Sequence, residues 1–391
     1  MTTVREQFYE PDHHAFRAMV RTFVQREIEP FHQRWDDDGH IDPQVWKTAG
    51  EQGLLGLAVP EEYGGGGAPD YRFRRVIAEE LARVGAASVN SHMALVDDLV
   101  MPYLRDLCTE EQKRRWLPGL CAGEITPALA ITEPGAGSDL RGITTTARLE
   151  ADEWVIDGSK TFITNSAYAD VLVIVARTAA PGGNNGFSLF LVPKGGPGFT
   201  VGRTLDKVGQ RGENVAELFF DGLRVPADTL LGVEGQGLSH LRDHLPTERM
   251  SIAVYSQAAA RAALDWTLAY VRERPVFGRT VADFQHTRFE LAEMTTELDV
   301  TDSFIADAVL ALNAGSLSAT DAAKAKWWAS ELQQRVTTRC LQLHGGYGYM
   351  RDYPIARAFL DGRIQTIYGG TTEIMKEIIG RDLVGPRPPV A

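Results

Sequence analysis

Two short segments of this sequence combine small residues with hydroxyl groups in a pattern that suits the binding of a polar ring or a phosphate. The first covers residues 131–139 (ITEPGAGSD), and the second covers residues 365–373 (QTIYGGTTE) near the C-terminus. Because glycine carries no side chain, backbone N–H groups in such segments can approach a ligand closely. One glycine-rich loop alone is usually a turn. The pattern gains weight from the further motifs that lie between these two segments.

Together these motifs, which extend over almost the whole chain, resemble those of the acyl-CoA dehydrogenases, a family of flavoenzymes. The resemblance implies an α+β fold with an N-terminal helical domain, a middle antiparallel β-domain and a C-terminal four-helix bundle. It implies FAD as the cofactor and oxidation of a saturated acyl-CoA thioester to the trans-2-enoyl-CoA. It also implies a homotetramer, arranged as a dimer of dimers, that passes electrons to an electron-transferring flavoprotein.

The catalytic base is the position at which this sequence differs from many members of that family. Those members carry a glutamate directly after the tyrosine of the C-terminal motif, where this chain has Gly369. A smaller branch, which includes long-chain and isovaleryl dehydrogenases, carries the glutamate on an earlier helix, and residues 245–250 (LPTERM) resemble that version. The resemblance therefore identifies Glu248 as the base and the backbone N–H of Gly369 as a donor to the thioester oxygen. A glutamate in a first helical turn also stabilises the helix N-terminus, which is the structural alternative for Glu248.

Two residues match positions that contact the CoA part of the substrate. They are Ser138 in the first segment and Arg249 beside the candidate base. The structural alternatives are a turn stabilised by Ser138 and Asp139, and a surface charge on a helix for Arg249. Ala94, near the region that forms the floor of the acyl pocket in relatives, is small and indicates room for a medium or long chain.

The resemblance assigns the cofactor contacts to several segments. Along a strand at residues 160–165 (KTFITN), alternation directs Phe162 and Thr164 to one face, where both can meet a flavin ring. A segment that begins with Arg274 reaches the FAD of a neighbouring subunit in relatives, although an arginine there can also interact with a helix C-terminus. The implied cofactor-binding residues are Leu129, Ile131, Thr132, Phe162, Thr164, Arg274, Phe277, Gln285, Gln342, Gly345, Gly346, Thr371 and Glu373.

The elements that must position these residues fall into three regions. At 391 residues the chain exceeds the size at which one core stops growing. Helical spacing of apolar residues characterises residues 1–124, short β-branched runs characterise residues 125–235, and long helical periodicity returns in residues 236–391. Asp157-Gly158 and residues 182–186 (GGNNG) are predicted as turns of the sheet. No Gly-x-Gly-x-x-Gly motif opens a strand–helix–strand unit, so we do not expect a Rossmann fold.

Composition excludes several other classes of function. The net charge of -12 argues against a nucleic-acid surface and against binding to an anionic membrane. Three cysteines without close pairing suggest neither a disulfide framework nor a zinc cluster. His240 and His244 have i, i+4 spacing, but no third metal ligand accompanies them, so we expect surface or interface histidines and no metal. Without a signal segment or a long apolar run, we expect a cytoplasmic protein with no membrane insertion.

Other readings of the same motifs stay open at this point. A relative that acts on an acyl chain bound to an acyl carrier protein, or one that is reoxidised by oxygen, would share the motifs around flavin and base. A non-catalytic relative that only binds FAD is the alternative outside enzymology, and the presence of Glu248 argues against it.

Overall fold

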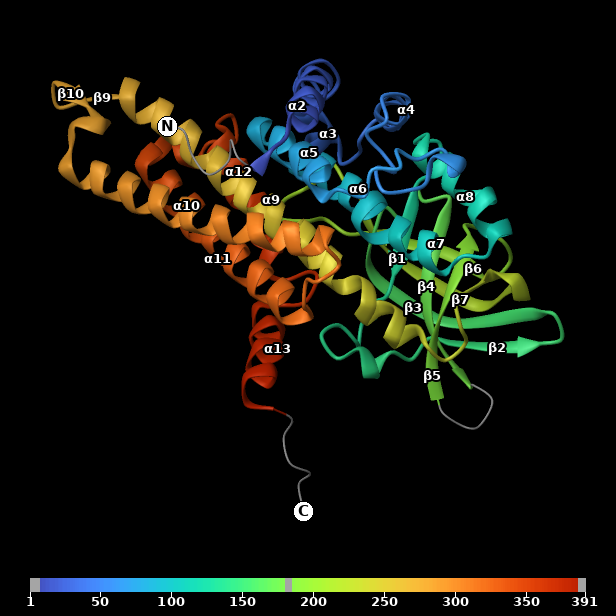
Figure 1. Cartoon of the computed structure of the whole chain (residues 1–391). Helices are drawn as coiled ribbons and strands as arrows, with labels where there is room; N and C mark the ends of the chain where they lie inside the picture. The colour runs from blue at the N-terminus through green and yellow to red at the C-terminus, as the bar shows by residue number, and fades with distance from the viewer. Residues whose placement is uncertain (1–7, 180–184, 386–391) are drawn as a thin grey trace.

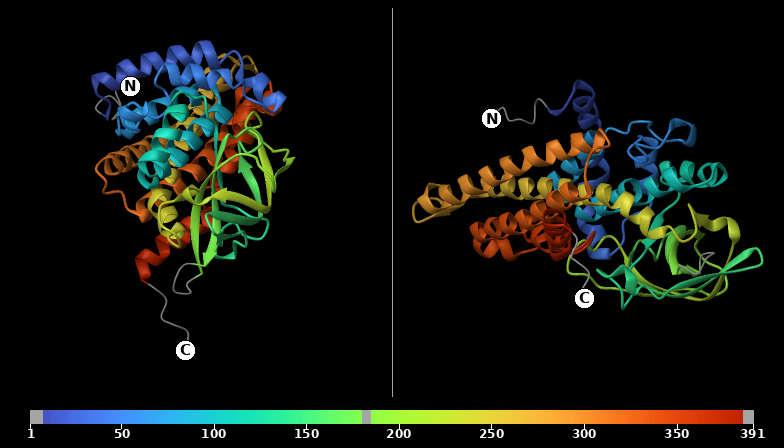
Figure 2. Two further views of the ribbon diagram at one scale, coloured as in Figure 1. Left: turned by 90° about the vertical axis from the view of Figure 1, so that its right-hand side faces the viewer. Right: turned by 60° about the horizontal axis from the view of Figure 1, so that its bottom comes forward.

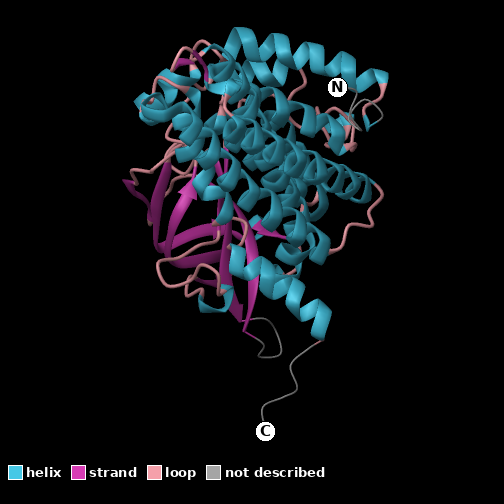
Figure 3. Cartoon of the chain, turned by 90° about the vertical axis from the view of Figure 1, so that its left-hand side faces the viewer, coloured by secondary structure: helices cyan, strands magenta, loops and turns pink. Residues whose placement is uncertain are grey.

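The computed structural model describes residues 8–179 and 185–385, and it divides into helical, sheet and helical parts in chain order (Figure 1). The strands of the large sheet gather on one side of the molecule, whereas helices form most of the remainder (Figure 3). The helices of the first part are α2 (Pro11–Phe23), η1 (Val24–Ile28), α3 (His32–Asp38), α4 (Gln44–Glu51), η2 (Glu61–Tyr63), α5 (Tyr71–Val84), α6 (Ala87–Ala94), η3 (Leu95–Val100), α7 (Met101–Leu107) and α8 (Glu110–Cys121).

The N-terminal helices owe their bounds to local sequence signals. Helix α5 begins after Asp70, whose side chain accepts a hydrogen bond from the backbone N–H of Arg72, and it ends at Gly85 in the left-handed conformation. The segment η3 is a π-helix that continues directly into α7, which has Pro102 in its first turn. Proline lacks an N–H, so it fits best where the regular α-helical ladder begins anew.

The middle part is an eight-stranded sheet with the path β6-β7-β3-β2-β4-β5-β8, to which β1 adds by pairing with β4. The expected purely antiparallel sheet is wrong in one respect, because β1 and β2 both pair with β4 in parallel. The strands are β1 (Pro127–Ala130), β2 (Thr146–Glu150), β3 (Glu153–Thr164), β4 (Val171–Ala179), β5 (Asn185–Pro193), β6 (Phe199–Thr204), β7 (Val215–Pro226) and β8 (Leu230–Leu231), with 3-10 turns at η4 (Leu140–Gly142) and η5 (Ala227–Thr229).

One of the two predicted turns in the sheet is a bulge. Asp157 and Gly158 lie inside β3, where the register with β7 shifts between Ile156 and Gly158. Gly158 has φ +148°, and a Cβ there would lie 2.5 Å from the Thr145 hydroxyl, so the glycine permits a close approach of two strands. Of the other predicted turn, residues 182–184 lie outside the described residues, whereas Asn185 and Gly186 begin β5.

The C-terminal part contains three long helices with two shorter ones packed on α11, and this confirms a helical C-terminal domain. Helix α9 begins at Gly237 and contains Pro246 in its interior. In the right-hand view of Figure 2, α9 and α10 run side by side away from the sheet. The elements are α9 (Gly237–Glu273), β9 (Pro275–Val276), β10 (Arg279–Thr280), η6 (Val281–Asp283), α10 (Gln285–Asn313), α11 (Ala319–His344), η7 (Gly345–Tyr349), α12 (Pro354–Gly362), η8 (Arg363–Thr366) and α13 (Thr372–Val384).

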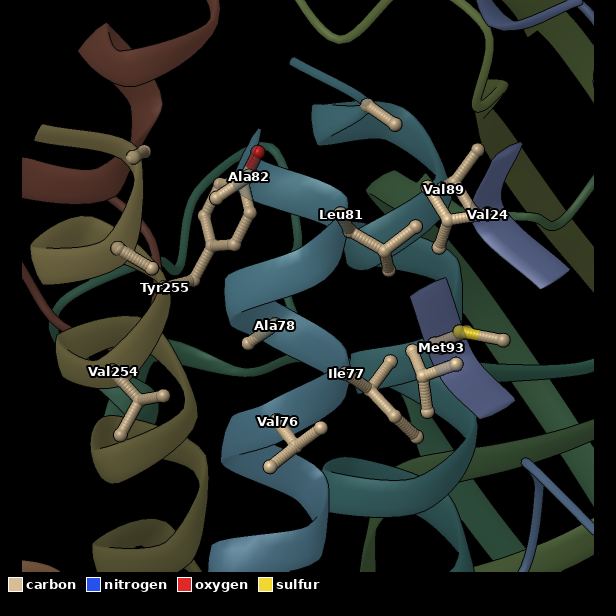
Figure 4. Close-up of a cluster of buried hydrophobic side chains, with 14 of the residues drawn as sticks. Val24, Val76, Ile77, Ala78, Leu81, Ala82, Val89, Met93, Val254 and Tyr255 are labelled. Atoms are coloured by element: carbon tan, nitrogen blue, oxygen red, sulfur yellow. The ribbon is translucent and has the colours of Figure 1, made fainter. Parts of the chain in front are cut away.

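The largest hydrophobic cluster joins the two helical parts across α5 and α9. Val76 and Ala78 of α5 lie on the side toward Val254 and Tyr255 of α9, whereas Ile77 points toward α6 (Figure 4). All of these side chains are buried, and burial of apolar surface is the main favourable term in such packing. Helix α9 is therefore held on the N-terminal helices, and no helix among the described residues is long and apolar enough to cross a membrane.

Candidate active site

The first glycine-rich segment and the following strand lie next to each other, as the sequence analysis expects of two parts of one binding surface. Thr161 of β3 donates its backbone N–H to the carbonyl of Thr132 at 2.9 Å. Leu129, at the third position of β1, and Ile131 both pack against the cluster beneath the sheet while remaining partly open. These residues come together because β1 and β3 belong to the same sheet.

A buried ion pair supports this segment from below. The Lys160 ammonium lies 2.8 Å from Glu133 Oε1 and donates to the Ile131 carbonyl at 3.0 Å, and the two charged side chains are 0% and 3% exposed. Glu133 also accepts from the backbone of Thr144 and of Thr145 at 2.7 and 3.0 Å. Burial opposes the charge on Glu133, but these donors more than offset it and lower its pKa to about 2. Burial lowers the pKa of Lys160 to about 8, against the pull of Glu133.

The end of β3 presents an aromatic side chain that the rest of the chain leaves uncovered. Phe162 is 66% exposed and has φ +59°, whereas Ile163 beside it is buried and Thr164 is half-buried. A non-glycine residue with positive φ is uncommon, and strain of this kind collects at ligand sites. Phe162 lies where the register of β3 with β7 shifts between Lys160 and Ile163, so simple strand alternation does not place Phe162 and Thr164 on one face. The exposed Phe162 ring offers a surface that a flat cofactor could cover.

Glu248 is buried inside α9, and a tyrosine from another helix holds its carboxylate. The Tyr103 hydroxyl donates to Glu248 Oε1 at 3.0 Å from α7. Because α9 begins at Gly237, Glu248 is not a first-turn residue, and the structural alternative of an N-terminal carboxylate is wrong. Burial raises the pKa of Glu248, although Tyr103, Arg249 and His244 each act in the opposite direction.

Of the two expectations for His244, a surface or an interface position, the surface position is wrong. Its ring is buried and stacks on the Tyr103 ring, with centroids 4.3 Å apart and planes 23° apart. His240, one turn earlier, is half-buried, and its Nε2 accepts from the backbone N–H of Val233 at 3.3 Å. No group of three or more His, Cys, Asp or Glu side chains suited to a metal occurs within residues 8–179 and 185–385.

The C-terminal glycine pair lies against the same part of α9. Gly369 has φ +63°, and a Cβ there would lie 2.4 Å from Cδ1 of Ile252, one turn after Glu248. The Arg249 guanidinium donates through Nε to the Gly369 carbonyl at 3.5 Å. The buried Lys326 ammonium of α11 donates to the Gly370 carbonyl at 2.7 Å, and burial together with Arg249 lowers the pKa of Lys326 to about 7. Two cationic side chains therefore hold two successive carbonyls of this loop.

An open cleft of about 740 Å³ leads along α9 toward this region. It brings together the two candidate substrate residues, Ser138 and Arg249, which are distant in sequence. Three further guanidinium groups line the same cleft, those of Arg141, Arg242 and Arg381. The cleft therefore offers local positive charge to an anionic ligand on a chain that is acidic as a whole.

A second pocket lies at the other end of the long helices. It measures about 420 Å³ and is lined by Arg274, Gln342, Gly345 and Gly346, four of the candidate cofactor residues. The Arg274 guanidinium lies 4.9 Å from the centre of the Tyr347 ring. No atom lies within 4 Å of where a Cβ on either glycine would be, so the backbone is open to a ligand there.

The remaining candidates lie near these two pockets. Phe277 is 89% exposed in the turn between β9 and β10, and Gln285 is the first residue of α10. Figure 1 shows this hairpin at the far end of α9 from the sheet, so one chain does not bring Arg274 near Thr164. Thr371 caps α13 by accepting from the Ile374 N–H at 3.4 Å, and Glu373 follows in its first turn.

Local sequence patterns do not indicate the roles of Tyr103, Lys326 and the Glu133–Lys160 pair. Tyr103 stands in an apolar stretch and is separated by 145 positions from the carboxylate that it contacts. Lys326 lies in a helix whose spacing gives no sign that its ammonium is fully buried. Only Lys160 had a local signal, since it opens the strand segment that carries Phe162.

Comparisons with known proteins agree over the length of the chain. Models of the acyl-CoA dehydrogenase N-terminal, middle and C-terminal domains match residues 10–124, 128–223 and 235–384. The mitochondrial long-chain specific acyl-CoA dehydrogenase of Sus scrofa is 43% identical over 380 residues, which are 97% of this chain and 88% of that protein.

Solved structures give the same result. An acyl-CoA dehydrogenase from Geobacillus kaustophilus is 42% identical with a TM-score of 0.92, and the match covers 96% of this chain and 99% of that one. A glutaryl-CoA dehydrogenase from Mycobacterium smegmatis in complex with FADH2 is 28% identical with a TM-score of 0.92, covering 98% of this chain and 97% of that one. These matches confirm the resemblance, the fold class and the expectation of a flavin-dependent oxidoreductase. The exposed Phe162 and the open Gly345-Gly346 backbone are features of this chain that fit FAD.

Proposed function

Because this chain belongs to the acyl-CoA dehydrogenase family, whose members depend on FAD, we propose that Glu248 is the base that removes the α-proton of a saturated acyl-CoA thioester. The buried carboxylate of Glu248, held by Tyr103 beside a glycine that has no side chain, carries this proposal. At position 369 a carboxylate would have to displace Ile252, whereas Glu248 needs no rearrangement.

The reaction requires a base whose strength approaches that of the substrate carbanion. An α-proton next to a thioester is a weak acid, and burial raises the pKa of Glu248 and so brings acid and base closer. The α C–H bond breaks, its proton goes to Glu248, and the β-hydrogen leaves with its electron pair as the double bond forms. Bound FAD supplies the acceptor for that hydride.

The Gly369 loop has the second role. We assign its backbone N–H to the thioester oxygen, on which negative charge develops as the α-proton leaves. Arg249 and Lys326 hold the carbonyls of Gly369 and Gly370, which fixes the two peptide groups that directly follow the Gly369 N–H. Such donors act most strongly when they need no rearrangement during the reaction.

The arginine-lined cleft suits the phosphorylated end of a CoA thioester. Ser138 and Arg249 lie where the CoA would enter, and Arg141, Arg242 and Arg381 provide charge for its phosphates. The small Ala94 at the end of α6 and the 43% identity to a long-chain enzyme both favour a long acyl chain.

The hairpin pocket supports an assembly in which two copies complete each flavin site. The sheet surface around Phe162, Thr164 and Thr132 would hold the flavin ring, while Arg274 and Gln342 of a second copy would hold the phosphates. A dimer of such dimers, with an electron-transferring flavoprotein as acceptor, completes the proposal.

The visible spectrum of the purified protein tests this function, recorded before and after anaerobic addition of saturated acyl-CoA of increasing chain length. We expect the flavin absorption of the wild type to bleach and that of Glu248→Gln to persist. Glu110→Gln is a matched control, because Glu110 also accepts from a tyrosine, Tyr63 at 2.6 Å, but lies outside the site. It should bleach like the wild type.

Bleaching of Glu248→Gln at the wild-type rate would refute Glu248 as the base. A wild type that no acyl-CoA bleaches would refute the CoA thioester as substrate. In that event a parallel sample with an acyl chain on a carrier protein separates a carrier-dependent enzyme from a protein that binds flavin without turnover.

A further inference from the structure

His244 has a hydrogen-bond environment that only a doubly protonated ring can satisfy. Its Nδ1 lies 2.7 Å from the backbone carbonyl of His240, and its Nε2 lies 3.2 Å from Oδ2 of Asp106. Both neighbours are acceptors when Asp106 is ionised, so each ring nitrogen must donate. Burial opposes the charge, but the bonds to Asp106 and His240 more than offset it and raise the pKa of His244.

The Tyr103 side chain connects this ring with the candidate base. One face of its phenol ring stacks on His244, and its hydroxyl donates to Glu248 Oε1 at 3.0 Å. A cation beside the phenol ring favours the electron-rich face and strengthens the hydroxyl as a donor. The contacts therefore run without a gap from Asp106 through His244 and Tyr103 to Glu248.

We propose that Tyr103 and the His244 imidazolium are positioning residues that keep Glu248 ionised and direct its second carboxylate oxygen toward the substrate. This inference rests on the proposed function of Glu248. Because Oε1 is engaged by Tyr103, Oε2 is the oxygen left to receive the α-proton. Neither Tyr103 nor His244 needs to touch the substrate for this purpose.

The other charges near these side chains do not replace that role. Arg249 interacts with Glu248 but donates to the carbonyl of Gly369. Arg105 donates to both oxygens of Asp106, at 2.7 and 2.9 Å, so Arg105 and His244 share Oδ2. The titratable and charged groups around the three side chains are Arg105 and Asp106 on α7, His240, Asp243 and Arg249 on α9, and Lys326 on α11.

The rate of flavin reduction as a function of pH tests the inference, with FAD-loaded protein and palmitoyl-CoA as the probe. Tyr103→Phe keeps the stacked ring and removes only the hydroxyl. Since a hydrogen bond to an ionised carboxylate favours its charged form, we expect the acidic limb of the rate profile to move up by about one pH unit. His244→Phe keeps a flat ring without the charge, and it should move the limb in the same direction by less.

Two further variants protect this test against a simple folding failure. Asp106→Asn leaves His244 in place without its anionic partner and should also move the acidic limb upward. Tyr63→Phe removes a hydroxyl that donates to a different glutamate, Glu110, and should leave the profile unchanged. If Tyr103→Phe and Asp106→Asn both show the wild-type acidic limb, the inference is overturned.

Histidine-selective NMR gives a readout that does not depend on turnover. We expect the His244 ring, assigned by its loss in His244→Phe, to show both nitrogens protonated at pH 7. A neutral ring with one protonated nitrogen would overturn the inference. The Glu248→Gln variant separates this inference from the proposed function. If Glu248→Gln still reduces flavin, the assignment of Glu248 as the base fails. If Glu248→Gln is inactive while Tyr103→Phe and Asp106→Asn keep the wild-type pH profile, only the positioning role of Tyr103 and His244 is refuted.

Discussion

Replacement of Lys160 by methionine should loosen the segment on which we place the flavin ring. The substitution keeps an unbranched side chain that is shorter by one atom, but it leaves the Glu133 carboxylate buried without its cation. The remaining donors to Glu133, which are the backbone N–H groups of Thr144 and Thr145 and the Thr144 hydroxyl, cannot neutralise its charge. The Ile131 carbonyl also loses its donor.

The change in stability can be estimated from the pKa shifts of Glu133 and Lys160, which contribute to the free energy of folding with opposite signs. Lowering the pKa of Glu133 from 4.5 to about 2 corresponds to about 3 kcal/mol of stabilisation, at about 1.4 kcal/mol per pH unit. Lowering the pKa of Lys160 from 10.5 to about 8 opposes it by a similar amount, so the intact pair is close to neutral in free energy. Removing one partner is different, because an unpaired buried charge costs about 3 to 5 kcal/mol.

The assay is urea denaturation followed by the fluorescence of released flavin. A chain of three parts need not unfold in one step, so flavin release is the appropriate local signal. We expect Lys160→Met to lower the free energy of this transition by about 3 to 5 kcal/mol. The double variant Lys160→Met/Glu133→Gln should recover at least half of the loss, because it no longer buries an unpaired charge.

The pH dependence provides an internal check on the same pair. The pKa of Glu133 is lower in the folded than in the unfolded chain, so its stabilisation is complete above pH 4.5 and disappears as the pH falls through about 2. A Lys160→Met variant within about 1 kcal/mol of the wild type, or a double variant less stable than either single one, would refute the reasoning.

Three further substitutions test other parts of the molecule. Gly369→Ala should destabilise the protein by about 1 to 2 kcal/mol through its positive φ, and by more through contact with Cδ1 of Ile252. In thermal denaturation the double variant Gly369→Ala/Ile252→Val should therefore recover part of the lost stability. No recovery would contradict the contact with Ile252. The pKa of Lys326 is about 7 in the folded chain and 10.5 in the unfolded chain, so the unfolded chain binds more protons between these values and the free energy of unfolding rises with pH. Lys326→Met should reduce that rise in urea titrations between pH 7 and 10.5. The same dependence of unfolding free energy on pH in the variant and the wild type would argue against the lowered pKa. Phe277→Ser should weaken association in analytical ultracentrifugation, because an aromatic side chain that is 89% exposed belongs in an interface, and unaltered association would remove the hairpin from it.

The order of the three parts could be predicted from the sequence because each has its own hydrophobic period. Helical spacing before residue 124, β-branched runs up to residue 235 and long helical periods afterwards reflect which side chains each element buries. The bulge at Gly158 could not be distinguished from a turn, because an Asp-Gly pair suits both. The parallel pairing of β1 with β4 depends on contacts between distant strands, which local patterns do not specify.

Candidate residues could be predicted from the sequence where they stand together in a short motif. Glu248 and Arg249 adjoin in sequence, and the glycines at 369 and 370 stand out by their type. Tyr103 and His244 were not predictable, since a tyrosine in an apolar stretch and a histidine at helical spacing fit ordinary packing equally well. Only the fold brings these two rings to one carboxylate.

The π-helical segment Leu95–Val100 determines where the helix before Tyr103 can lose a residue without turning that side chain. A π turn accommodates one residue more than an α turn, and each residue of an α-helix advances the side chains by about 100°. Loss of a single codon within this segment should therefore convert the π turn into an α turn and leave α7 in its present orientation, with Tyr103 still facing Glu248. A single-residue deletion in the regular α-helical turns of α7 before Tyr103 has no surplus residue to remove, so it should be purged in descendants that retain the activity.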